Sequence, residues 1–162
     1  MKKLMLMLGV VVALLATSCI KGPTGGGTSS NTFYGKLTVK NSDNETIYSD
    51  SKATLVVTIP DILEMNLTLL FKGVKFSEMM PLAINMELKD IPFDFTVSED
   101  GTTRNFLFDA QNIKPTDYEE YNIDRVWGCV GKEIDVQFTL ERKSEHYHVY
   151  FKAGDTTSES TL

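Results

Sequence analysis

Histidine and cysteine are scarce in this sequence, with two of each among 162 residues. His146 and His148 stand two apart in a segment with strand-like alternation, so both side chains point to one face and could reach one metal ion. Two ligands fall short of the three protein ligands that a catalytic zinc site needs. We therefore expect two solvent-facing histidines, no bound metal and no other cofactor.

The motifs of common catalytic sites are also missing. The sequence holds no G-x-S-x-G elbow, no glycine-rich phosphate loop and no H-E-x-x-H pair. Cys129 has no evident general base for nucleophilic chemistry. We expect a non-enzymatic protein. A hydrolase is the weaker alternative, and it would need carboxylates or Cys129 to converge in a cleft.

Positive charge is in short supply. The 16 lysines and arginines are outnumbered by 22 aspartates and glutamates, which gives a formal net charge of −6. An acidic protein repels the phosphates of nucleic acid, so nucleic acid is not an expected partner. The same charge gives no help in lying on an anionic membrane surface.

Apolar runs of bilayer-spanning length are absent, because the run from Leu4 to Ala16 is shorter than the roughly 20 residues that a membrane helix needs. This run follows the basic start Met1-Lys2-Lys3 and ends within the small or aliphatic residues 15–18, which is the order of a secretory signal. Cys19 comes directly after, and the junction resembles the lipobox of bacterial lipoproteins. The resemblance implies cleavage before Cys19, lipid on that cysteine and attachment to the membrane of the cell envelope. A plain secretory signal would not require Cys19.

The rest of the sequence divides into three parts. Residues 19–32 form a tether rich in glycine, serine and threonine, residues 33–154 form one domain, and residues 155–162 form a polar tail. Lipid on Cys19 would leave Cys129 without a disulfide partner. We expect Cys129 to be a small buried residue.

The domain shows the period-two alternation of apolar and polar residues that is typical of half-buried strands. The alternating segments are 33–40, 54–59, 63–71, 82–89, 93–98, 104–109, 133–141 and 146–151. Turn-forming residues lie between them, at 41–44, 99–101 and 144–145. The sequence predicts an all-β fold, an antiparallel meander of about eight strands in a barrel or a sandwich; a barrel leaves no open edge.

One segment departs from this pattern. Thr116 with Glu119 three residues later fits a capping box, and Pro115 precedes it. We expect a short helix over about 116–122, lying across one end of the strands. The acidic residues 117, 119, 120 and 124 could suit Ca²⁺, but they lack the spacing of an EF-hand loop. A solvated helix face is the favoured interpretation.

Six short segments of the domain carry a likeness to a known family, namely residues 33–39, 67–69, 74–76, 80–81, 84–89 and 149–154. In these segments the domain resembles the calycin-like β-barrel lipoproteins of Bacteroidetes. The resemblance implies an eight-stranded, lipocalin-like barrel held at the outer membrane, and it implies no particular ligand. Bacteroidetes lipoproteins bound for the cell exterior tend to carry acidic residues just after the lipidated cysteine, whereas here Ile20-Lys21-Gly22 follows. Whether the domain faces the periplasm or the cell surface is therefore open.

The candidate binding residues are aromatic and sulfur-containing. Tyr118, Tyr121 and Trp127 lie close in sequence, and they could stack on a sugar, close over an apolar ligand, or plug one end of the barrel. Met65 and Met86 would give an adaptable lining. We expect a protein that binds a small apolar or amphipathic ligand in or at the mouth of a barrel. The alternative is a structural or accessory subunit of an outer-membrane complex, with a filled barrel.

Overall fold

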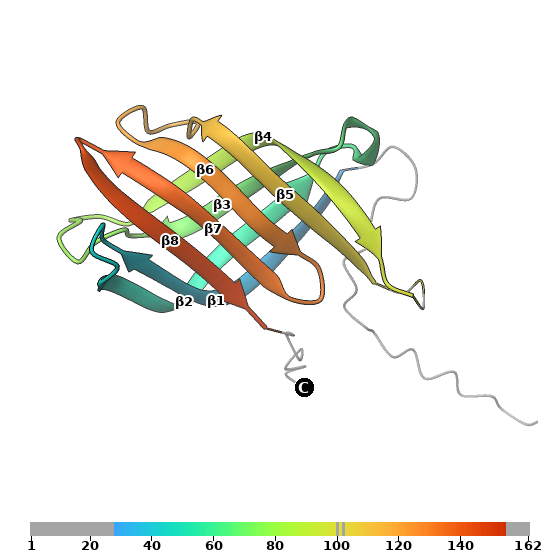
Figure 1. The fold of residues 1–162 in the computed structure, drawn as a ribbon, viewed down its shortest axis with the longest axis horizontal. Coiled ribbons are helices and arrows are strands. Elements are labelled where there is room, and N and C mark those ends of the chain that lie inside the picture. The colour runs from blue at the N-terminus through green and yellow to red at the C-terminus, as the bar shows by residue number, and fades with distance from the viewer. Residues whose placement is uncertain (1–27, 100, 102, 155–162) are drawn as a thin grey trace, which may run out of the picture.

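The computed structural model describes residues 28–99, 101 and 103–154, which form a closed barrel of eight antiparallel strands in sequential order (Figure 1). The predicted all-β barrel is confirmed. The strands are β1 (Ser29–Lys40), β2 (Thr46–Ile59), β3 (Asn66–Val74), β4 (Ile84–Val97), β5 (Arg104–Ile113), β6 (Asn122–Val130), β7 (Ile134–Arg142) and β8 (Glu145–Ala153). The predicted signal peptide, Cys19, most of the tether and the polar tail lie outside the described residues. Within the described ranges, no helix has the length and apolar character to cross a bilayer.

The strand alternation of the sequence separates the inside of the barrel from the outside. In β7 the side chains of Ile134, Val136, Phe138 and Leu140 are buried, and those between them are half-buried on the outer wall. Each strand therefore places apolar residues in one shared interior and polar residues in solvent.

The barrel closes where β1 pairs with β8, from Lys36 opposite Lys152 to Lys40 opposite His148. Gly35 lies at the start of this contact, next to a register shift between Gly35 and Leu37 on the β2 side. A Cβ atom at Gly35 would clash with the backbone carbonyl of Lys152, and would lie 2.9 Å from Phe151 Cζ. The missing side chain is thus a condition for closure.

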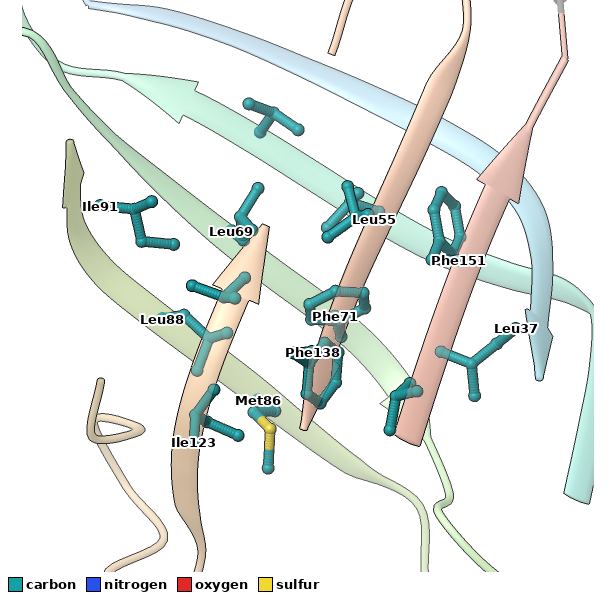
Figure 2. Close-up of a cluster of buried hydrophobic side chains, with 14 of the residues drawn as sticks. Leu37, Leu55, Leu69, Phe71, Met86, Leu88, Ile91, Ile123, Phe138 and Phe151 are labelled. Atoms are coloured by element: carbon teal, nitrogen blue, oxygen red, sulfur yellow. The ribbon is translucent and has the colours of Figure 1, made fainter. Parts of the chain in front are cut away.

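The interior is filled by side chains of the barrel itself (Figure 2). Phe71 packs against Phe138 and Phe151 with ring centroids 5.2 and 6.1 Å apart, and Phe93 packs edge-on against Phe106 at 5.2 Å. Every one of these rings is at most 4% exposed. No polar or charged residue is buried among the described residues, so the interior of this barrel is a continuous apolar core.

Two predicted strands, 82–89 and 93–98, are parts of the single strand β4. Leu88 and Ile91 are both buried although they stand three residues apart. Leu69 pairs with Leu88 and Leu67 with Ile91, so β4 has an additional residue here, and Asp90 adopts a left-handed φ of 56°. This β-bulge restores the inward direction after the break in alternation.

The predicted helix over 116–122 is wrong. The backbone N–H of Thr116 donates to the carbonyl of Glu87 in β4, and the N–H of Tyr121 donates to the carbonyl of Tyr118, which closes a single turn. Tyr121 is buried and β6 begins at the next residue, Asn122. Burial of this tyrosine and the early start of β6 leave no room for a second helical turn.

Strand β6 itself is absent from the sequence prediction. Its buried residues Ile123 and Val126 stand three apart, a spacing that does not fit a regular strand. The register shifts between Ile123 and Arg125, which makes Asp124 the additional residue of a bulge in β6.

The strand ends differ from the prediction on both sides of β2. β1 begins at Ser29, so residues 29–32 of the predicted tether are strand and pair with the end of β2. The strand predicted from residue 63 begins at Asn66 instead. A 3₁₀ turn over Ile62–Glu64, η1, precedes it, capped by Asp61, and Met65 follows with a left-handed φ of 53°.

Candidate functional site

The structure separates the five predicted binding residues into three places. Tyr121 is 4% exposed and packs against Phe76, with 6.1 Å between the ring centroids. Tyr118 packs against Tyr121, with 6.2 Å between the ring centroids. Both tyrosines close the end of the core between β5 and β6, as the plug interpretation expects. Met86 is fully buried, and Met65 packs half-buried near the opposite end. Trp127 lies on the outer wall.

Trp127 is the first member of an aromatic row on the outside of the barrel. The His148 ring lies 5.2 Å from it, and Tyr150 stacks on His148 at 4.2 Å with 28° between the ring planes. Trp127 comes from β6, and His148 and Tyr150 come from β8. The outward-facing Gln137 of β7 pairs with both Trp127 and Tyr150, so the row crosses three neighbouring strands.

Cationic side chains lie against both ends of the aromatic row. Arg125 Cζ is 4.9 Å from the centre of the Trp127 ring, and Lys40 Nζ is 5.6 Å from the centre of the Tyr150 ring. Arg125 also donates two hydrogen bonds to Asp109, at 2.9 and 2.6 Å, and they hold the pKa of that carboxyl below its usual value. Asp109 thereby fixes the position of Arg125.

Beside the aromatic row, the outer wall is hollowed between β8 and β1. The hollow is lined by Lys36, Thr38, Lys40, Tyr150 and Lys152, and we call it the basic hollow. Lys152 pairs with Asp135 at 2.9 Å. Among the described residues, Lys36 and Lys40 have no carboxylate partner. An acidic protein therefore has a local excess of positive charge here.

His148 contributes an uncharged ring to this surface. Partial burial, and secondly the nearby Lys40, lower its pKa below the ordinary value of 6.5. Its Nδ1 shares a hydrogen bond of 2.8 Å with the hydroxyl of Tyr150. The neutral imidazole supports the tyrosine ring, and the positive charge of the surface comes from the lysines and Arg125.

Cys129 is half-buried on the outer wall and not in the core as expected, because it occupies an outward position of β6 opposite Asp135. Its Sγ lies 4.0 Å from the carbonyl oxygen of Glu133. The described residues show no histidine in contact with it, so the arrangement resembles no thiol–imidazole pair.

The sequence points to Trp127 as a candidate binding residue, but not to the residues that surround it in the structure. Tyr150 and His148 occupy outward positions of β8, and there the alternation indicates only that the side chains face solvent. The sequence feature that could have indicated these residues is the presence of aromatic rings at strand positions that face solvent. The neighbouring lysines of β1 come from the other end of the sequence and become neighbours only when β1 meets β8.

Comparison with models of protein families finds no match, and neither do comparisons with curated proteins and with solved structures. The resemblance to calycin-like lipoproteins therefore remains a prediction from strand patterns.

Proposed function

We propose that this chain is a lipid-anchored, non-enzymatic protein of the outer membrane, of the calycin-like kind, that binds an acidic carbohydrate on the outer wall of its barrel. The observation that carries the proposal is the basic hollow lying directly beside the aromatic row. The anchor is the lipid proposed on Cys19, and the domain faces either the periplasm or the cell surface.

The filled interior favours the outer wall over the barrel cavity as the binding surface. A ligand inside the barrel would have to displace rings such as Phe71 and Phe138, which are fully buried against each other. Displacing one large apolar side chain from a core costs about 3–5 kcal/mol, judged from the cost of deleting it. The outer wall requires no such rearrangement.

The chemistry of the hollow suits a sugar that carries a negative charge. Tyr150, held by its stack on His148, offers apolar ring surface of the kind that packs against a sugar ring. Lys36 and Lys40 supply ammonium groups without carboxylate partners among the described residues, and these would pair with a carboxylate, phosphate or sulfate. The hydroxyl of Thr38 can hydrogen-bond a sugar hydroxyl.

Isothermal titration calorimetry tests this proposal by comparing the affinity for an oligogalacturonide, which is acidic, with the affinity for a neutral dextrin of equal length. We expect the acidic oligomer to bind more tightly, and its affinity to fall with added salt because exposed charges are screened. Tyr150→Ala and the double variant Lys36→Gln/Lys40→Gln should each weaken binding about tenfold, or 1.4 kcal/mol.

Lys72→Gln is the matched control, since Lys72 is an exposed lysine of β3 outside the hollow. It should bind as the unchanged protein does. Equal affinity for the two oligomers, or equal weakening by all the variants, would contradict the assignment of the hollow.

A structural or accessory subunit is the second candidate function, favoured by exposed apolar side chains in the loop between β3 and β4. Met79 is 92% exposed and Leu82 is 75% exposed. Such residues are typical of contact surfaces when they cluster. Crosslinking from position 79 or 82 in native membranes should then capture a partner protein, and recovery of the monomer alone would count against this function.

A further inference from the structure

Three side chains with metal-binding atoms gather on the outer wall, outside the surface described above. They are Asp124 of β6, Glu141 of β7 and His146 of β8, and their ligand atoms all lie within 4.8 Å of one another. Glu141 and His146 face each other across the β7–β8 pair. The three donors thus come from three adjacent strands.

The bulge in β6 contributes one of the three donors. Ile123 pairs with Leu140 and Arg125 with Thr139, so Asp124 has no partner residue across the ladder. The side-chain amide of Asn122 donates to Asp124 Oδ1 at 3.0 Å, which fixes the direction of that carboxylate. Bulges commonly redirect a side chain next to a binding site.

The two carboxylates have no cationic partner within the part of the chain that the structure describes. The ion pairs there join Lys89 to Glu87, Arg125 to Asp109 and Lys152 to Asp135. Arg125, although adjacent to Asp124 in sequence, is turned toward Asp109. Neighbouring negative charges without a counter-charge repel each other, so a bound cation would stabilise the cluster.

We propose that Asp124, Glu141 and His146 form a binding site for a divalent transition metal ion of the zinc type. One imidazole and two carboxylates match the ligands of Zn²⁺, whereas Ca²⁺ and Mg²⁺ prefer oxygen ligands alone. Bonds of about 2.0–2.2 Å place two donors of one ion at most about 4.4 Å apart. Small rotations of these solvent-accessible side chains therefore complete the geometry. A fourth position stays open, and the site is independent of the proposed carbohydrate function.

The sequence contains two histidines, which gives this site an internal control. His148 lies between Trp127 and Tyr150, stacked on the tyrosine, and has no part in the cluster. We suggest titrating Zn²⁺, and separately Co²⁺, into the untagged full-length protein in detergent after dialysis against EDTA. Calorimetry gives the affinity and stoichiometry, and NMR of the imidazole protons distinguishes the two histidines.

We expect one Zn²⁺ per chain, and stronger Co²⁺ broadening of the His146 resonances than of those of His148. His146→Ala and Glu141→Gln should each weaken binding at least about tenfold, since even indirect partners of metal ligands contribute that much. Asp43→Asn, an exposed carboxylate in the turn between β1 and β2, is the matched control and should bind unchanged. The proposal is overturned if Zn²⁺ does not bind, if the His146 and Glu141 variants bind as tightly as the control, or if His148 is broadened as strongly as His146.

Discussion

Replacing Phe138 by alanine tests whether the barrel is filled, which decides where a ligand can bind. Phe138 lies on β7, is fully buried and points into the interior (Figure 2). The centroid of its ring lies 5.2 Å from that of Phe71 and 6.0 Å from that of Phe76. The substitution removes the ring from the middle of the core without changing the outer wall.

The expected loss follows from two contributions. Deleting a buried phenylalanine costs about 3–5 kcal/mol of unfolding free energy, from lost burial and from the cavity left behind. Aromatic pairs add about 0.5–1.5 kcal/mol each beyond burial, and Phe138 takes part in two. We therefore expect a loss in the upper part of this range, about 4–5 kcal/mol. That is a large fraction of the roughly 5–15 kcal/mol that stabilises a typical domain.

Urea unfolding followed by circular dichroism measures the loss, and the single tryptophan, Trp127, gives a second probe by fluorescence. Phe138→Leu keeps most of the apolar volume and should cost less than Phe138→Ala. Thr139→Ala is the control, because Thr139 neighbours Phe138 on β7 but is half-buried on the outer wall. It should change stability by less than about 1 kcal/mol.

A loss below about 1 kcal/mol for Phe138→Ala would refute the filled interior, since a ring bordering an open cavity has less contact to lose. The same result would return the interior of the barrel to consideration as a ligand site. A loss of equal size for Thr139→Ala would show that the inward and outward faces of β7 are assigned wrongly.

Three further outcomes follow from the contacts described. Gly35→Val should destabilise the barrel strongly, because β8 backbone occupies the space of its side chain; a denaturation midpoint equal to that of the unchanged protein would contradict the closure geometry. The pKa of Asp109 is lowered by its pair with Arg125, so this pair stabilises the fold at pH values above the ordinary aspartate pKa of about 3.9. The stabilisation is lost as the pH falls below that value. Asp109→Asn should therefore flatten the acid limb of a curve of stability against pH. Burial, with the hydrogen bond to Glu145, raises the pKa of Tyr147 to about 12, so ultraviolet titration should show a phenol ionising near that pH that Tyr147→Phe removes.

The alternation of apolar and polar side chains predicts the fold class, because within each strand it shows which face is buried. β7 and β8 follow the alternation without interruption and were located within two residues at each end. The alternation failed where a bulge inserts a residue. In β4 it divided one strand in two at Asp90, and in β6 the spacing of Ile123 and Val126 concealed a strand. A predicted total of about eight strands is thus correct although one strand was divided and another missed.

The candidate site could be predicted only in part. Trp127 was singled out because it lies near Tyr118 and Tyr121 in sequence. Those tyrosines joined the core, since Tyr121 packs against Phe76 from another loop. The true neighbours of Trp127 are His148 and Tyr150, and no local pattern connects β6 with β8 across β7.

Two-faced antiparallel strands around one apolar core can be inferred from the amino-acid sequence alone, because period-two alternation is a local property of each segment. The other features depend on contacts between segments that lie far apart in the chain. Whether the interior is open or filled depends on the summed volume of rings from many strands, such as Phe71, Phe138 and Phe151. The basic hollow exists only because β1 closes on β8, which brings Lys36 and Lys40 beside Tyr150. Registers between segments so distant in sequence follow from the closed barrel as a whole, and not from any one of its strands.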